Sequence, residues 1–145
     1  MRDAVGGTFM IYVFLIFLAV YITFTAVALN YAKAFRVKNS VIDIIEQNEG
    51  IDDFNNTSGV IGQINNRLKD FNYNVTIPDG DIDKYCNGRD NYFDRGYCIS
   101  EVKDVMDRKY YQVVTFVQIQ FPIFDNLTIN VPIKGETRMI ERINT

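Results

Sequence analysis

Two cysteines, Cys86 and Cys98, are the most reactive side chains in this chain of 145 residues. They lie twelve positions apart in a polar stretch rich in Asn, Gly and Asp. This spacing fits neither a CxxC redox motif nor a zinc site, and the sequence contains no His. We therefore expect a disulfide that closes a short loop in an oxidising compartment. Two unrelated thiols are the alternative.

Three aspartates at alternate positions, Asp79, Asp81 and Asp83, resemble the start of a calcium-binding loop. An EF-hand would continue with Gly at its sixth position and Glu at its twelfth, where this chain has Lys84 and Asp90. An Asp-rich surface turn is therefore the favoured interpretation, and an irregular calcium site is the alternative.

Catalytic groups are scarce in this sequence. Ser occurs only at positions 40, 58 and 100, and without His no nucleophile stands beside a recognisable base. The net charge of -3 offers no basic surface for nucleic acid. We expect a non-enzymatic protein that uses no cofactor and binds no nucleic acid directly.

A long uncharged segment at the start of the chain positions everything that follows. From Phe9 to Leu29 there is no charged residue, Pro or Gly. A helix needs roughly 20 apolar residues to cross the hydrocarbon core of a membrane, so this segment is long enough. A cleavable signal sequence is the alternative, with Ala26, Ala28 and Ala32 imitating its cleavage site.

The same helix is expected to continue beyond the membrane. No helix breaker occurs before Gly50, which is a plausible C-terminal cap. We predict one helix over residues 1–50, with a membrane-spanning part over about 9–29 and an amphipathic extension over about 30–49.

Two faces of this helix have distinct chemistry. One face is an aromatic ridge, whose residues are spaced alternately three and four positions apart: Phe14, Phe17, Tyr21, Phe24, Ala28, Tyr31 and Phe35. Another face carries small or polar residues, on which a second backbone can approach closely: Ala19, Thr23, Ala26 and Asn30. We expect self-association through the helix, because the ridge continues past the apolar segment. A ridge that only faces lipid is the alternative.

Two signals disagree on orientation. Lys33, Arg36 and Lys38 follow the apolar segment and only Arg2 precedes it, which by the positive-inside rule would place the C-terminal part in the cytoplasm. The cysteine pair indicates the opposite side. We expect the globular part to lie outside the cytoplasm.

Residues 51–145 are enough for one small α+β domain. The periodicity predicts a helix over 59–70, with Thr57 or Ser58 as its N-cap. Alternation with period two predicts strands over 73–77, 97–102, 109–121, 127–133 and 136–143, with a turn at Asp125 and Asn126. In the strand over 109–121, the odd-numbered positions from Tyr111 to Phe121 share a face. The expected fold is an antiparallel meander with one face on the helices and one in water.

The segment between the cysteines carries three aromatic residues, Tyr92, Phe93 and Tyr97. In an exposed loop they would contact a partner, and the alternative is that they fold back as a small satellite core. Four Asn-x-Ser/Thr sequons would be glycosylation sites in a eukaryote and are mostly chance in an Asn-rich bacterial chain: Asn55, Asn56, Asn74 and Asn126.

A long apolar helix followed by an antiparallel sheet resembles the architecture of type IV pilins and pseudopilins. Within that group the chain is more similar to the TadE-like proteins of tight-adherence pilus systems. The apolar start carries the resemblance together with the ending FPIFDNLTINVPIKGETRMIE, residues 121–141, in which a Pro-containing strand, a turn, a second strand and a Gly-Glu-Thr-Arg segment follow one another. The middle of the chain carries no such resemblance.

This resemblance implies a pilin-like fold, a membrane anchor that packs through the aromatic ridge, and assembly with pilin subunits into or in support of a cell-surface pilus. Such a pilus would serve adhesion, DNA transfer or secretion. Prepilins are usually cleaved after a Gly and have Glu at the fifth mature position, but cleavage after Gly7 would place Tyr12 there. Processing and major-subunit status therefore stay open. The alternative function is a monomeric, membrane-tethered binding or sensor domain.

Overall fold

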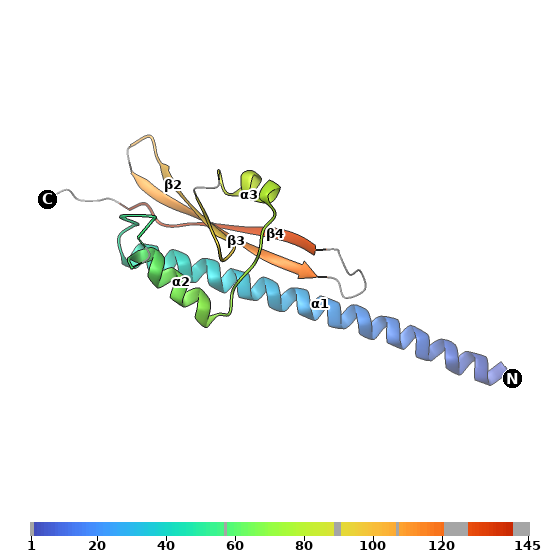
Figure 1. Ribbon diagram of the computed structural model, residues 1–145. Helices are drawn as coiled ribbons and strands as arrows, with labels where there is room; N and C mark the ends of the chain where they lie inside the picture. The colour runs from blue at the N-terminus through green and yellow to red at the C-terminus, as the bar shows by residue number, and fades with distance from the viewer. Residues whose placement is uncertain (1, 57, 89–90, 107, 121–127, 141–145) are drawn as a thin grey trace.

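The structure is a computed structural model that describes residues 2–56, 58–88, 91–106, 108–120 and 128–140 (Figure 1). Its elements are α1 (Arg2–Gln47), α2 (Val60–Asp70), α3 (Asp79–Tyr85), β1 (Tyr92–Phe93), β2 (Tyr97–Lys103), β3 (Lys109–Gln120) and β4 (Thr128–Glu136). This is the α+β layout predicted from the sequence, with a long N-terminal helix and a small antiparallel sheet. The turn predicted at Asp125 and Asn126 lies outside the described residues.

α1 is a single helix that ends slightly earlier than predicted. Its last residue is Gln47, and the left-handed position after it is occupied by Glu49, with φ of 55°. The N–H of Glu49 donates to the Glu46 carbonyl (3.2 Å), and that of Gly50 donates to the Ile45 carbonyl (3.0 Å). This pair of bonds is a Schellman motif, so Gly50 follows the capping position instead of occupying it.

α2 confirms the second predicted helix, which starts one residue later than predicted, but not its predicted N-cap. Gly59 is the N-cap residue and makes no side-chain capping bond, so Ser58 does not cap this helix; Thr57 lies outside the described residues. At the other end, Asn72 has φ of 49°, and the N–H of Tyr73 donates to the Leu68 carbonyl (2.9 Å). This is a second Schellman motif, and its two flanking apolar side chains, Leu68 and Tyr73, are both buried.

The sheet is an antiparallel meander in the order β1-β2-β3-β4. The strands predicted over 97–102 and 109–121 correspond to β2 and β3, and β2 pairs with β3 from Tyr97 opposite Thr115 to Lys103 opposite Lys109. β4 is an edge strand, which is where Pro132 is tolerated because it has no N–H to donate.

Two predicted strands are wrong. Residues 73–77 are extended and bury alternate side chains, but they form no strand ladder; the N–H of Val75 donates to the Arg95 carbonyl (3.1 Å). β4 continues through Gly135 to Glu136, and of the described residues beyond it only Ile140 forms a β-bridge, with Lys109. Residues 141–143 of that predicted strand lie outside the described residues.

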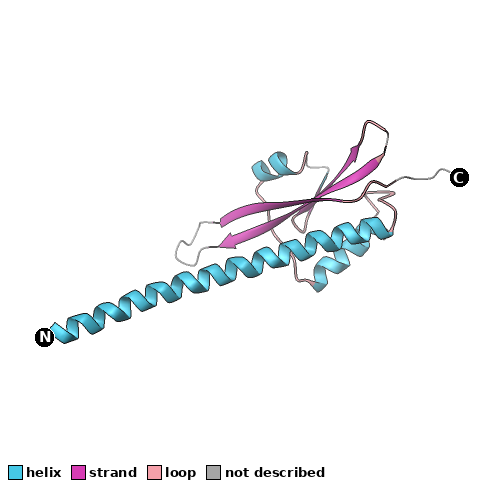
Figure 2. Ribbon diagram, turned by 180° about the vertical axis from the view of Figure 1, so that it is seen from behind, coloured by secondary structure: helices cyan, strands magenta, loops and turns pink. Residues whose placement is uncertain are grey.

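Helices pack on both faces of the sheet, so the prediction that one whole face lies in water is wrong in part: α3 covers some of that face, while Thr128, Lys134 and Glu136 of β4 stay exposed on it. α1 and α2 pack on one face, and α3 lies on the other (Figure 2). β3 accordingly buries side chains at odd-numbered and at even-numbered positions. Tyr111, Val113, Thr115 and Val117 belong to the predicted inward face, and Val114 and Phe116 belong to the opposite one. The ring of Tyr85, at the end of α3, packs edge-on against that of Phe116, with 6.2 Å between centroids.

The Gly-Glu-Thr-Arg segment joins the end of β4 to β3 and α1. The N–H of Tyr111 donates to the hydroxyl of buried Thr137, and the N–H of Thr137 donates to the Tyr111 carbonyl, both at 2.9 Å. The N–H of Arg138 donates to the Glu46 carboxylate on α1 (2.8 Å). At Gly135 an added Cβ would lie 2.7 Å from the Lys38 side chain, so the absence of a side chain lets α1 approach.

Candidate functional site

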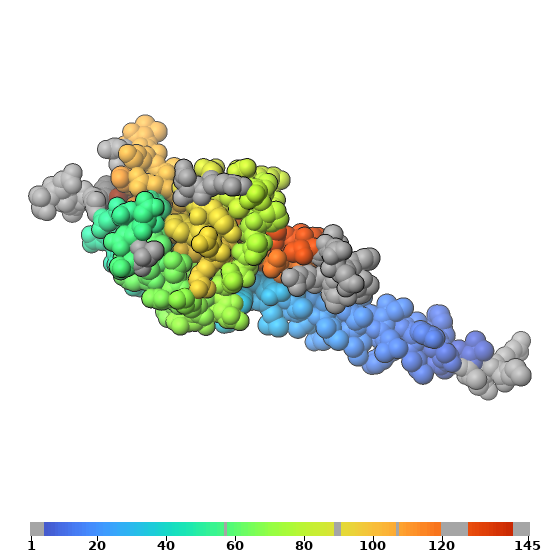
Figure 3. All heavy atoms as spheres, in the orientation of Figure 1, coloured from blue at the N-terminus to red at the C-terminus, as the bar shows by residue number. Residues whose placement is uncertain are grey.

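The first half of α1 projects from the globular part of the molecule as an isolated rod (Figure 3). It is long and apolar enough to cross a membrane, and none of its most apolar window is buried in the chain's own fold. The exposed side chains include large apolar groups on all sides, among them Phe9, Ile16, Phe17 and Phe24. A soluble monomer rarely exposes an apolar patch of more than a few hundred Å². This half of α1 therefore requires a lipid or protein environment.

The side of α1 that contacts the sheet is defined by a stripe of fully buried residues at steps of three and four: Ala34, Val37, Val41 and Ile45. The Thr115 hydroxyl donates to the Ala34 carbonyl (3.1 Å) and ties β3 to this stripe. Toward the N-terminus the stripe continues through Thr23 and Val27, which are the only side chains of residues 5–32 that are not exposed.

The predicted small-residue face belongs partly to this inward stripe. Thr23 is half-buried, and its hydroxyl donates to the Ala19 carbonyl one turn earlier (2.9 Å). Asn30 lines a cleft between α1 and the sheet. Small side chains there let the chain's own domain approach α1, so this part of the face does not require a second helix to explain it.

The aromatic ridge lies to one side of the surface of α1 that contacts the chain's own domain. It lies about a third of a turn from the buried stripe, which follows from 3.6 residues per turn. All six of its aromatic side chains are exposed: Phe14, Phe17, Tyr21, Phe24, Tyr31 and Phe35. The last two matter most, because they lie beside the globular domain and are still 53 % and 43 % exposed. The Lys38 ammonium lies 4.3 Å from the centre of the Phe35 ring.

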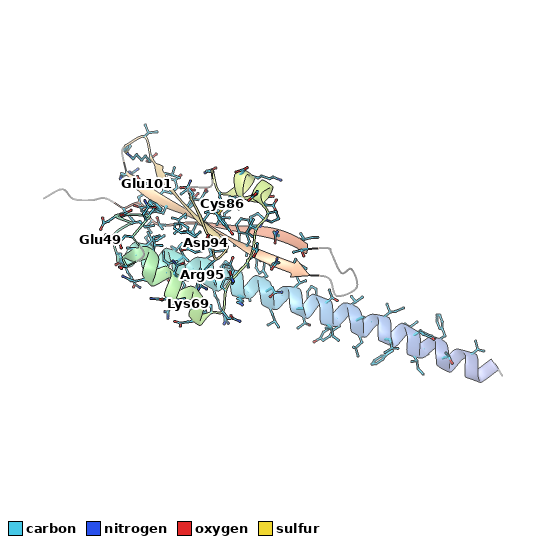
Figure 4. All side chains as sticks on the ribbon, in the orientation of Figure 1. Glu49, Lys69, Cys86, Asp94, Arg95 and Glu101 are labelled. Atoms are coloured by element: carbon cyan, nitrogen blue, oxygen red, sulfur yellow. A yellow bond between two sulfur atoms is a disulfide. The ribbon has the colours of Figure 1, made fainter. Side chains whose placement is uncertain are left out.

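The expected disulfide is present. Cys86 at the end of α3 is bonded to Cys98 in β2, and both residues are buried (Figure 4). The Ser100 hydroxyl donates to the Cys86 carbonyl (3.4 Å) and adds a second link between α3 and β2. Sequence reasoning missed both α3 and β1, the two elements that the bridge and its loop hold against the sheet.

The aromatic residues of the disulfide loop fold back onto the sheet. Tyr92 and Phe93 form β1 and are half-buried, and Tyr97 begins β2 with no exposed surface. The Phe93 and Tyr97 rings stack with 4.8 Å between centroids, and the Tyr97 hydroxyl donates to Asn65 on α2 (3.0 Å). Burial raises the pKa of Tyr97. The satellite-core interpretation is therefore the correct one, and the loop offers less aromatic surface to a partner than expected.

The three aspartates lie on a helix instead of a surface turn. Asp79, Asp81 and Asp83 belong to α3, whose N-cap residue is Pro78. Side chains two positions apart on a helix point to different sides, so the three carboxylates do not converge. Within the described residues no group of three or more His, Cys, Asp or Glu side chains is placed to hold a metal ion.

One buried tyrosine closes a gap that the strands leave open, and sequence reasoning did not find it. β2 begins at Tyr97, so on the β2 side of β3 the backbone of Phe116 has no strand partner. The Tyr73 hydroxyl accepts from the Phe116 N–H (2.9 Å) and donates to the Gly96 carbonyl (2.8 Å). Burial raises the pKa of Tyr73 to about 12, so this hydroxyl keeps its proton and serves the structure.

The remaining sequence candidates lie in ordinary surroundings. Gly7 is inside α1, with open space where a side chain would be. The sequon residues Asn55, Asn56 and Asn74 are exposed, and Asn126 lies outside the described residues. No family model matches the sequence, and no curated protein or solved structure matches it.

Proposed function

We propose that this chain is a membrane-anchored, pilin-like or TadE-like subunit that associates with copies of itself or with other pilins through α1. In this role it forms or supports a cell-surface pilus used in adhesion, DNA transfer or secretion. The observation that carries the proposal is the aromatic ridge, which stays exposed on one unbroken helix from the projecting half to the side of the globular domain. A helix that served only as an anchor would need apolar surface within the lipid alone.

The energetics of the ridge favour a protein partner beyond the lipid. Burial of an aromatic side chain stabilises an interface in proportion to the apolar area removed from water, about 25 cal/mol per Å². Tyr31 and Phe35 are the ridge residues past the apolar segment, where lipid tails no longer cover them. In an assembly they would pack against the helix of a neighbouring subunit.

The disulfide supports an extracytoplasmic domain in this proposal. Disulfides persist in oxidising compartments and are rare in the cytoplasm. The Cys86–Cys98 bridge holds α3 on the sheet, so the domain depends on an environment in which the bridge survives.

The double substitution Tyr31→Ala and Phe35→Ala tests the assembly proposal. Both side chains are exposed in the single chain, so the melting temperature of the domain should change little. We expect oligomers in neutral detergent, and filaments on cells, to be lost. The matched control is Tyr12→Ala, an exposed aromatic residue on the other side of α1, which should assemble normally.

The alternative of a monomeric membrane-tethered domain makes the opposite prediction. If the double variant assembles as the unmodified chain does, or if the unmodified chain is a monomer, the packing proposal is wrong. The mass of the native N-terminus separately distinguishes a subunit processed after Gly7 from an unprocessed anchor.

A further inference from the structure

A cleft lies where α1 leaves the globular domain. Its volume is about 350 Å³, and three segments line it: α1, the extended chain after α2, and the end of β3. The polar side chains around it are those of Asn30, Lys33, Asn74 and Gln118. The Lys33 ammonium donates to the Asn72 carbonyl at the rim (2.6 Å), which fixes its position and leaves two of its three N–H groups for another acceptor.

The chemistry of this lining suits an anion. One ammonium group and three amide groups supply hydrogen-bond donors, and no carboxylate is among the described residues that line the cleft. Hydrogen bonds from a cation to an anionic oxygen are about twice as strong as neutral ones. Oxygen-rich anions such as a phosphate diester therefore match the cleft better than a neutral or cationic ligand.

The position of the cleft along α1 indicates the source of that anion. The interfacial layer on each side of the hydrocarbon is about 5–8 Å thick, and a helix rises about 1.5 Å per residue. Asn30 and Lys33 come one and four residues after Leu29, the end of the apolar segment. Their backbone therefore lies about 1.5–6 Å past the hydrocarbon, at the level of the lipid phosphates.

Further charged side chains lie near the cleft. Arg67 and Lys69 occupy the last turn of α2, just before the Asn72 that Lys33 contacts, and Asp70 is the acidic residue beside them. Lys69, Arg95 and Asp94 all lie nearer than Glu49 and Glu101 to the point where α1 leaves the domain (Figure 4). This end of the domain therefore carries both basic and acidic side chains, and among the described residues that line the cleft Lys33 is the charged one.

We propose that this cleft binds the phosphate of an anionic phospholipid headgroup in the leaflet that the globular domain faces. The proposal rests on the membrane anchoring proposed above. Bound lipid would fix the height and tilt of the domain on the membrane, because the cleft is built from both α1 and the sheet.

Native mass spectrometry of the full chain in neutral detergent tests this with short-chain phosphatidylglycerol and phosphatidylcholine. We expect retained phosphatidylglycerol to exceed phosphatidylcholine. Asn74→Asp, which places a carboxylate at the cleft on an exposed residue, should weaken phosphatidylglycerol binding about fivefold or more. The matched control Asn55→Asp adds the same charge at an exposed position of another loop and should leave binding unchanged.

A second pair of variants separates charge from folding. Lys33→Gln should weaken binding and Lys33→Arg should retain it, whereas Lys103→Gln, at an exposed position at the end of β2, should have no effect. Equal retention of the two lipids, or equal losses in Asn55→Asp and Asn74→Asp, would overturn the proposal. So would displacement of the lipid by inorganic phosphate at the same concentration, because the site would then recognise the free anion.

The two proposals fail in different ways. If alkaline carbonate releases the chain from membranes, the proposed anchoring is wrong. If the chain stays in the membrane and assembles but has no preference for phosphatidylglycerol, only the lipid-binding inference is wrong.

Discussion

Gly96 stands where Val75, in the chain after α2, packs directly against the turn before β2. An added Cβ there would overlap the backbone carbonyl of Val75, and the residue has φ of 83°, in the left-handed region. The turn brings Gly96 beside Val75, and this close passage lets the Tyr73 hydroxyl reach Phe116 and Gly96. A residue with no side chain is required here on two separate grounds, conformation and space.

Comparing two glycine substitutions separates these grounds. Gly88 has φ of 114° and open space where a side chain would be. Gly88→Ala should therefore lower the free energy of unfolding by about 1 kcal/mol, from backbone strain alone. Gly96→Ala adds the overlap with Val75 and should cost about 3 kcal/mol or more. Thermal melting of both variants in neutral detergent checks this. Equal losses would show that the close passage at Val75 contributes nothing.

Among the elements, α3 depends most on a covalent link. It has only seven residues, too few to be stable as an isolated helix, and its buried apolar contacts come from Ile82 and Tyr85. The disulfide and the Ser100 hydroxyl hold its C-terminal end on β2. The Tyr85 ring at the end of α3 packs on Phe116, so loss of α3 would expose this part of the second face of the sheet.

Removal of the disulfide should therefore destabilise the whole domain. A bridge that closes a loop of this length contributes about 3 kcal/mol. The double variant Cys86→Ser and Cys98→Ser should melt about 10 °C or more below the unmodified chain. A reducing agent should lower the melting temperature of the unmodified chain similarly and leave the variant unchanged. If the reducing agent left the melting temperature of the unmodified chain unchanged, this role of the disulfide would be wrong.

At the scale of the whole molecule, the proposed membrane anchoring leaves two orientations for the globular domain. The hairpin between β2 and β3 lies at the end of the sheet away from the projecting half of α1, and its Val105 side chain is fully exposed (Figure 1). The chain has no free cysteine, so a cysteine introduced there is a specific reporter.

The variant Val105→Cys should react with a membrane-impermeant maleimide on intact cells. This result follows if the domain lies outside the cytoplasm, as the disulfide indicates. Labelling that appears only after lysis would instead support the orientation predicted by Lys33, Arg36 and Lys38. The unmodified chain is the control for background labelling.

The sequence by itself determined the features that arise from short-range periodicity. An uncharged run gives a long helix, spacing of three and four gives α2, and alternation with period two gives β2, β3 and β4. The disulfide was also predictable, because two cysteines in a polar loop have one possible partner each.

Only the tertiary structure decided which faces of the helices and strands are buried. Residues 73–77 have the burial pattern of a strand, but they form no ladder with the sheet. Instead, the Tyr73 hydroxyl bonds to the backbone of Gly96 and Phe116. α3 is too short for periodicity to reveal, and it covers part of the face expected in water. The stripe through Ala34 and Val37 and the ridge through Tyr31 and Phe35 are both apolar in sequence. Long-range packing of the sheet buries the first and leaves the second exposed, because only one side of a helix can contact one sheet.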